Sequence, residues 1–225
     1  MNAITRCLDT YWSSSIGKKY VVAITGIVLV LFLAGHLSGN LLIFVGREAF
    51  NEYAEFLHGA LHGAGVWIAR IGLLVMLILH VVATISLARQ NRAARQPYEF
   101  EATLQASKSS RIMILTGLTI LAFVIFHLLH FTVRVDAQLA DLGATDPYGM
   151  VVVGFQNTLV VIFYIISMTL LCSHLSHGVA SIFQTLGLRS KKARGAIRTL
   201  SLGYTLVIWA GFISIPLAIL TGFVR

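Results

Sequence analysis

Five long apolar runs, separated by short charged connections, dominate this chain of 225 residues. A helix needs about 20 consecutive apolar residues to cross the hydrocarbon core of a bilayer, and each run reaches that length. The composition agrees, because only 12% of the residues are charged, against about 25% in soluble domains. We therefore predict an all-α membrane protein with five transmembrane helices, at about residues 20-46, 66-88, 112-133, 151-186 and 199-224.

We expect one integral membrane domain over residues 1-225, because no low-complexity tract or long linker interrupts the runs. The fourth run exceeds what one crossing needs, so we expect its last residues to continue as helix beyond the hydrocarbon. The segment from Met1 to Lys19 is polar and shows no signal-peptide cleavage site, so we expect that the first span is not removed as a signal peptide. Cys7 and Cys172 are predicted to be ordinary thiols.

Basic and acidic residues alternate between successive connections, which predicts the orientation of the chain. Lys and Arg accumulate on the cytoplasmic side of membrane proteins. Here they gather before the first span and in the second and fourth connections, whereas the first and third connections are acidic on balance. Five crossings then place the N-terminus inside and the C-terminus outside. The basic residues are Arg6, Lys18, Lys19, Arg89, Arg92, Arg95, Lys108, Arg111, Arg189, Lys191, Lys192, Arg194 and Arg198, and the acidic ones are Glu48, Glu52, Glu55, Asp136, Asp141 and Asp146.

The first acidic connection, from Arg47 to Leu61, carries aromatic and aliphatic residues among its acids at near-helical spacing. This pattern predicts a helix on the outer membrane surface. The net charge of +8 is divided among the short loops instead of forming one folded patch. Topology explains this charge, and we expect no nucleic-acid partner.

Histidines inside the predicted spans are the strongest functional signal, because ionisable side chains are costly in a bilayer. Six of the eight histidines lie in spans one to four. A helix rises about 1.5 Å per residue, so His36 and His127 share one level, and His80 lies roughly 10 Å nearer the cytoplasm. His174 also falls towards the inner end of its span. The remaining two, His130 and His177, lie three residues beyond His127 and His174.

Two levels, each with histidines from two helices, are what two bis-imidazole haems stacked through a bundle require. We predict His36 with His127 at the outer haem and His80 with His174 at the inner haem. The alternatives are interhelical hydrogen bonding, a proton relay or divalent metal transport. A transporter should also show buried carboxylates or broken helices, but the predicted spans contain no Asp or Glu and only Pro216 interrupts one.

Several local stretches resemble those of a known family: FLAGHLSGN around His36, EAFNEYAEF in the first connection, LILH ending at His80, TGLTILAFVIFH ending at His127, and SHLSHG around His174. From about Ser14 onwards the chain resembles the single-chain, five-helix, dihaem cytochrome b subunits of bacterial succinate dehydrogenases and fumarate reductases. The resemblance implies that helices one and three hold the distal haem and helices two and four the proximal haem. It also favours His127 over His130 and His174 over His177, which depth alone does not decide.

The resemblance further implies a subunit of succinate:quinone oxidoreductase in the bacterial cytoplasmic membrane, serving the tricarboxylic acid cycle. Its two haem b groups would carry electrons between an iron-sulfur subunit and menaquinone or ubiquinone. The chain has no GxGxxG motif and no cysteine cluster, so FAD and iron-sulfur clusters would belong to the flavoprotein and iron-sulfur partners. Two other classes stay open: the cytochrome b subunit of a hydrogenase or formate dehydrogenase, and a non-redox transporter.

Other polar residues near the spans have two interpretations each. His130 and His177 either assist the ligands as hydrogen-bond donors or simply pack. Lys18 and Lys19 either face haem propionates or the partner subunit, or anchor the first helix at the interface. Arg70 either pairs with a propionate or extends outwards to the interface.

Three glycines near the predicted ligands, Gly35, Gly39 and Gly178, would let either a haem or a neighbouring helix approach closely. Glu48, Glu52 and Glu55 are candidates for quinone chemistry by location, and solvated surface charge is the simpler interpretation. His58 and His62 lie outside the spans and are expected to be interfacial without an assigned role.

Overall fold

The computed structural model describes residues 12–94 and 112–225. All of its regular elements in these ranges are helical, and five of the described helices are long and apolar enough to cross a membrane. The sequence prediction of an all-α protein with five such helices is confirmed. The five are formed by α2 (Ser15–Asn40), α4 (Ala64–Ala93), α6 (Met113–His127) together with the π-helical segment Leu128–Val133 that continues it, α9 (Thr158–Thr185) and α10 (Arg194–Leu220). Three shorter helices, α3 (Arg47–Gly59), α7 (Ala137–Thr145) and α8 (Pro147–Gly154), lie between them.

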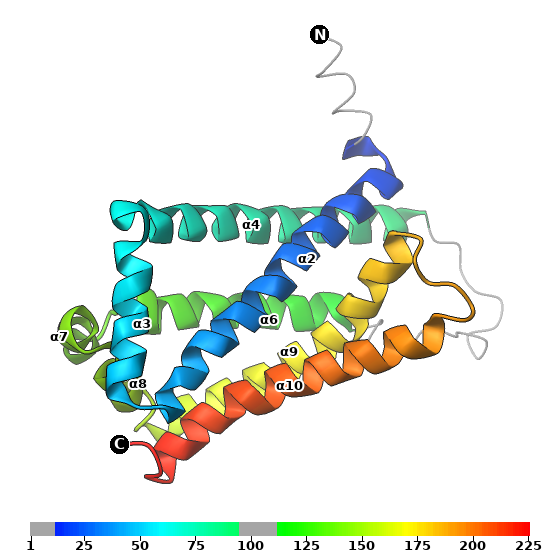
Figure 1. Cartoon of the computed structure of the whole chain (residues 1–225). Helices are drawn as coiled ribbons and strands as arrows, with labels where there is room; N and C mark the ends of the chain where they lie inside the picture. Colours follow the sequence, from blue (N-terminus) through cyan, green and yellow to red (C-terminus); the bar gives the residue numbers. More distant parts are fainter. Residues whose placement is uncertain (1–11, 95–111) are drawn as a thin grey trace.

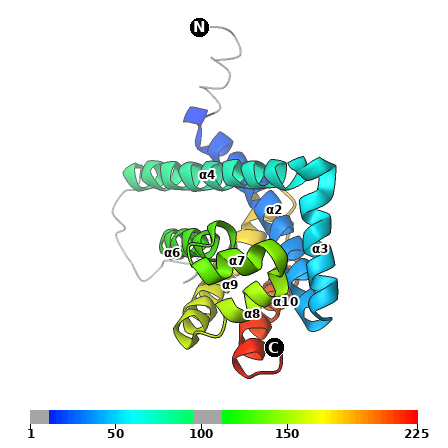
Figure 2. The same cartoon turned by 90° about the vertical axis from the view of Figure 1, so that its left-hand side faces the viewer.

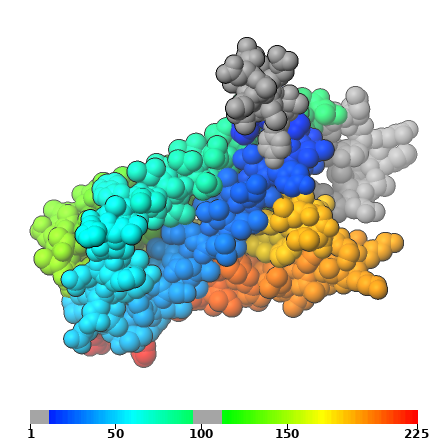
Figure 3. Space-filling model, turned by 45° about the horizontal axis from the view of Figure 1, so that its top comes forward, coloured from blue at the N-terminus to red at the C-terminus, as the bar shows by residue number. Residues whose placement is uncertain are grey.

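The five long helices form a bundle with α2 slanting across its middle (Figure 1). Helix α2 packs on α4 and on α9, while α6 and α10 both pack on α9. Helix α10 also contacts α2, where Leu37 lies against Gly211 and the Tyr204 hydroxyl donates to the carbonyl oxygen of Val30 at 2.5 Å. Figure 3 shows α2 filling the seam between α4 and α10 on one face of the molecule.

The bundle has two chemically different ends. Helices α3, α7 and α8 gather at one end, and the connection from α9 to α10 lies at the other (Figures 1 and 2). All six acidic residues within the described ranges belong to the first end, which we call the acidic end. The opposite, basic end carries Arg89, Arg92, Arg189, Lys191, Lys192, Arg194 and Arg198. Arg6, Cys7, Arg95, Lys108 and Arg111 lie outside the described residues.

The long fourth apolar run is divided into two helices, which the sequence did not indicate. Helix α8 ends at Gly154 and α9 begins at Thr158. Asn157 caps α9, because its side-chain oxygen accepts hydrogen bonds from the backbone N–H groups of Leu159 and Val160 at 2.9 and 3.4 Å. We expected the excess length at the C-terminal end of this run. Part of it lies instead at the beginning, where α8 folds back across the acidic end.

Helix α3 forms within the first acidic connection, as its spacing predicts, and runs across the acidic end of the bundle (Figure 2). Its Tyr53 ring packs against Gly39 of α2, where a Cβ atom would lie only 2.5 Å from the ring. The Asn51 amide donates to Asp146 at 2.8 Å, and Arg47 forms an ion pair with the same carboxylate. On the outside, the Phe56 side chain is 69% exposed. The helix therefore holds to the bundle through polar contacts and through Phe50, which packs on the core beside Tyr148, while Phe56 stays outside.

Candidate functional site

The structure brings His36 of α2 and His127 of α6 side by side. Their ring centroids are 5.8 Å apart, and their planes are at 82° to each other. Two imidazoles that bind one metal from opposite sides have ring centres about 6 Å apart, because each metal–nitrogen bond is about 2 Å long. We call these two residues the acidic-end pair. Their spacing would allow the two rings to bind one haem iron between them.

A single buried tyrosine connects the acidic-end pair to a third histidine. The Tyr164 hydroxyl of α9 lies 3.1 Å from His127 Nδ1 and 3.0 Å from His130 Nδ1. A phenol carries one hydrogen, so it can donate to only one of these rings and accepts from the other. Donation from His127 Nδ1–H leaves the Nε2 lone pair of that ring free for a metal and directs the tyrosine hydrogen to His130.

The two histidines that follow the predicted ligands have different surroundings. His130 lies in a short π-helical segment, Leu128–Val133, and its ring centroid is 4.0 Å from that of Phe131. π-Helical turns occur often at functional sites. For the His177 side chain, no hydrogen-bond partner is found among residues 12–94 and 112–225. Sequence reasoning treated His130 and His177 alike, and the structure gives a polar partner only to His130.

The second pair of histidines lies nearer the basic end, and each member meets a buried threonine of a neighbouring helix. His80 of α4 has its Nδ1 3.0 Å from the Thr25 hydroxyl of α2. His174 of α9 has its Nδ1 3.3 Å from the Thr116 hydroxyl of α6. We call His80 and His174 the basic-end pair.

Thr25 marks the level of His80, and Thr116 marks the level of His174. His36 follows Thr25 by 11 residues along α2, and His127 follows Thr116 by the same number along α6, so each helix separates the two levels by about 16 Å along its own axis. The separation of roughly 10 Å from depth counting stays a prediction. The four histidines thus occupy two levels.

Sequence reasoning missed Thr25, Thr116 and Tyr164. The tyrosine had a recognisable signal, because a phenol inside an apolar run needs a hydrogen-bond partner when it is buried. The two threonines also had one, since each precedes a glycine and lies at the same distance before a histidine of the acidic-end pair.

Comparisons of this chain with protein-family models, curated proteins and solved structures found no match. The histidine geometry is therefore the main structural basis for a proposed function.

The three glycines singled out in the sequence have different neighbours. A Cβ atom at Gly39 would collide with Tyr53 of α3, so this glycine serves the packing of the surface helix. At Gly35 and Gly178 an added Cβ atom would meet no atom of the described residues within 4 Å. Close packing of protein helices accordingly explains Gly39 but neither of the other two.

The basic residues near the spans also have different surroundings from one another. Lys18 is 7% exposed, and its Nζ donates to Gln90 Oε1 of α4 at 3.2 Å, so it joins α2 to α4 near the basic end. Lys19 is exposed. The Arg70 guanidinium lies over the Trp67 ring at 5.1 Å, one turn nearer the acidic end, which matches a side chain extending outwards.

The remaining predicted candidates lie on the surface of the acidic end. Glu48, Glu52 and Glu55 of α3 are exposed, as expected for solvated charges. The His58 and His62 side chains are exposed as well, and His58 Nδ1 lies 2.7 Å from the carbonyl oxygen of Ala54. None of these residues is brought into contact with the acidic-end pair.

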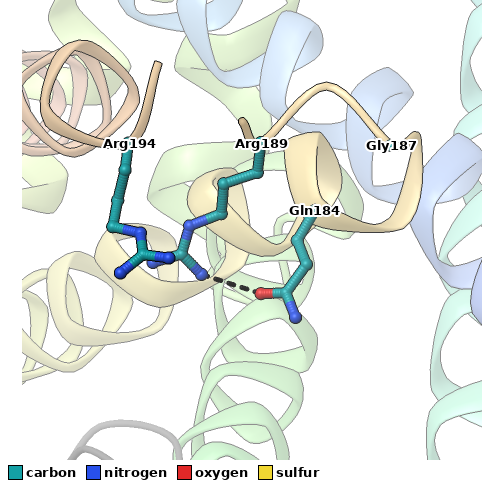
Figure 4. Close-up of a pocket in the computed structure, with 4 residues that line it drawn as sticks. All are labelled: Gln184, Gly187, Arg189 and Arg194. Carbon is teal, nitrogen blue, oxygen red and sulfur yellow. Dashed lines mark hydrogen bonds between the residues drawn. The ribbon is translucent and has the colours of Figure 1, made fainter. Parts of the chain in front are cut away.

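A separate pocket of about 510 Å³ opens at the basic end (Figure 4). It is lined by Gln184, Gly187, Arg189 and Arg194. Arg189 donates to Gln184 Oε1 at 2.8 Å, and both the Arg189 and Arg194 side chains line the pocket. Within the described ranges neither arginine pairs with a carboxylate, because the one ion pair found there joins Arg47 and Asp146.

Proposed function

We propose that this chain is the membrane-anchoring, dihaem cytochrome b subunit of a bacterial succinate:quinone oxidoreductase. The observation that carries the haem assignment is the arrangement of four histidines from four helices in two pairs at two levels. The assignment to succinate dehydrogenase or fumarate reductase rests on the resemblance of the stretches around these histidines. This assignment agrees with the distribution of the four histidines, one on each of α2, α4, α6 and α9.

In this proposal, His36 and His127 hold one haem b, and His80 and His174 hold the other. Haem supplies the one-electron chemistry, and the protein supplies ligands, their orientation and a low-dielectric surrounding. The side chains that orient the rings are Tyr164 near His127, Thr25 near His80 and Thr116 near His174. Such partners fix which ring nitrogen carries the proton and which one faces the metal.

The basic end is the side on which we place the cytoplasm and the catalytic partners. Lys and Arg accumulate on cytoplasmic loops. Arg189 and Arg194, which line the pocket at this end, suit a complementary acidic surface on another protein. An iron-sulfur subunit bound there, carrying a flavoprotein with FAD, would exchange electrons first with the basic-end haem. The acidic-end haem and quinone, either menaquinone or ubiquinone, complete the path.

Purification of the native complex from its membrane tests this proposal directly. We expect a reduced-minus-oxidised spectrum of two low-spin haem b groups, co-purification of a flavoprotein and an iron-sulfur protein, and succinate-driven reduction of a quinone analogue. A haem-free preparation would favour a transporter. A dihaem preparation that accompanies hydrogenase or formate dehydrogenase activity would support that alternative class.

Reporter fusions test the orientation independently. A reporter placed near Lys192 should be cytoplasmic, and one placed near Glu52 or Asp141 should be on the opposite side. The reverse result would place the catalytic partners at the acidic end and would contradict the electron path proposed here.

A further inference from the structure

A short pattern occurs twice in the chain, once in α2 and once in α6. In each helix a Thr-Gly pair precedes a histidine of the acidic-end pair: Thr25–Gly26 before His36, and Thr116–Gly117 before His127. His36 follows Thr25 by 11 residues, and His127 follows Thr116 by the same number. Eleven residues are close to three helical turns, so the threonine and the histidine lie on the same face of their helix. Each helix thus offers an imidazole at one level and a hydroxyl group at the other.

The threonine hydroxyl groups are placed to accept a hydrogen bond from the basic-end histidines. Thr25 Oγ1 donates its hydrogen to the carbonyl oxygen of Val21 at 2.7 Å. A hydroxyl group has one hydrogen, and within a helix it is commonly given to the carbonyl one turn earlier. The oxygen that faces His80 at 3.0 Å is then the acceptor, so His80 Nδ1 carries the proton.

The same arrangement is found around His174, the other member of the basic-end pair. Thr116 Oγ1 shares its one hydrogen between the carbonyl oxygens of Ile112 and Met113, at 3.2 and 3.1 Å. Its oxygen faces His174 Nδ1 at 3.3 Å. Both threonines are 3% exposed, so water does not replace these contacts.

The glycines of the repeated pattern lie against the same two rings. A Cβ atom at Gly26 would lie 3.6 Å from His80 Cε1, and one at Gly117 would lie 3.4 Å from His174 Cε1. Each imidazole therefore lies over a glycine with its Nδ1 turned to the preceding threonine. The two halves of the basic-end level are built alike by the pairs α2 with α4 and α6 with α9.

We propose that Thr25 and Thr116 are matched positioning residues for the two axial ligands of the basic-end haem. Each hydroxyl oxygen accepts the Nδ1–H of one imidazole, fixes its tautomer and leaves Nε2 to bind the iron. This inference rests on the proposed haem function and adds the residues that set the electron affinity of one haem. A hydrogen bond from Nδ1–H makes an axial imidazole a stronger electron donor, which favours the oxidised iron.

The test uses the isosteric variants Thr25→Val and Thr116→Val in the intact complex, with optical redox titration and electron paramagnetic resonance of both haems. Each variant should raise the midpoint potential of the basic-end haem. Loss of one hydrogen bond should change its reduced-to-oxidised ratio at a fixed ambient potential by about fivefold. The double variant should show the two shifts added, because the threonines lie on different helices and orient different rings. The acidic-end haem should keep its potential.

Matched variants separate positioning from general damage to the helices. Thr25→Ser and Thr116→Ser keep the hydroxyl group and should restore the potential. Thr119→Val is the control on α6, because its exposed hydroxyl bonds only the Leu115 carbonyl, at 2.9 Å. Loss of the basic-end haem in a valine variant, with recovery in the serine variant, would also support positioning.

Three results would overturn the inference: unchanged potentials in both valine variants, equal shifts of both haems, or a shift confined to only one of the two threonines. A wild-type complex with two low-spin haems would in each case leave the proposed function standing. A wild-type complex without haem would instead refute the proposed function, and this inference with it.

Discussion

The two levels of histidines use the same ligand chemistry in different surroundings. At the basic end each imidazole has its own threonine, and the two halves match. At the acidic end Tyr164 of α9 is shared between His127 and His130, whereas the partner found for the His36 ring is Asn40 of its own helix. The Asn40 amide donates to the His36 backbone carbonyl at 2.7 Å and lies 3.3 and 3.4 Å from the two ring nitrogens. Because hydrogen bonds to axial ligands tune haem potentials, we expect the two haems to differ in potential.

Replacing the ligands themselves should give the largest effect. His36→Ala and His127→Ala should each remove or convert the acidic-end haem, since loss of one imidazole opens an iron position in a low-dielectric site. His80→Ala and His174→Ala should do the same to the basic-end haem. Haem quantification and low-temperature difference spectra of the four purified variants measure this. The two-level comparison is wrong if His36→Ala and His80→Ala remove the same haem.

Tyr164→Phe should have a smaller effect, confined to the acidic end. It removes the acceptor of the His127 Nδ1–H, so the midpoint potential of that haem should rise, with a change of about fivefold in its reduced-to-oxidised ratio. Tyr204→Phe is the matched control, because its hydroxyl bonds the Val30 carbonyl instead of a histidine. A shift of the basic-end haem in Tyr164→Phe would show that the two levels are not independent.

His130→Ala and His177→Ala should have still smaller effects on the haem spectra, and these effects should differ between the two variants. Both variants should retain two low-spin haems. His130→Ala removes a partner of Tyr164 and should alter the acidic-end spectrum slightly, whereas His177→Ala should leave both spectra unchanged. Electron paramagnetic resonance of the oxidised complex resolves such differences. Loss of the acidic-end haem in His130→Ala, with retention in His127→Ala, would reverse the choice of ligand.

The smallest effect should follow Asp146→Asn at the surface of the acidic end. Burial acts to raise the pKa of Asp146, but the Asn51 amide, the Gly149 N–H and the Arg47 charge together hold it below its ordinary value of 3.8. A lowered pKa stabilises the folded state above that ordinary value, and the contribution is lost as the pH falls through the lowered pKa. Because the pair is partly exposed, the variant should lose only about 0.5 kcal/mol near neutral pH.

Hydrogen exchange of α3 measures this contribution. The wild-type protein should lose protection in α3 below about pH 4, while Asp146→Asn should already show reduced protection at neutral pH. Neither the variant nor the change of pH should alter the ligand environment of the basic-end haem through this contact. An equal loss of protection in α4 would indicate that the bundle unfolds as one unit.

Features that depend only on helix length and on the regular rise per residue could be predicted from the sequence. Five apolar runs indicated the long helices, and counting residues at a fixed rise placed His36 level with His127. Contacts that depend on helix tilt and rotation were not accessible, as Thr25 with His80 shows. The break between α8 and α9 was also missed, because the cap at Asn157 is one polar residue in a long apolar run. Tyr164 required the relative rotation of α6 and α9 before its two partners could be identified.

The 11-residue spacing on α2 and α6 restricts how these helices can change during evolution. Inserting or deleting one residue between Thr25 and His36 would turn one of them by about 100° relative to the other. One haem level would then lose either its ligand or its orienting hydroxyl group. Side chains between these positions can be exchanged freely for others of similar size, and the connections outside the bundle can lengthen. Within these two segments, the geometry therefore constrains the number of residues more than the identity of most side chains.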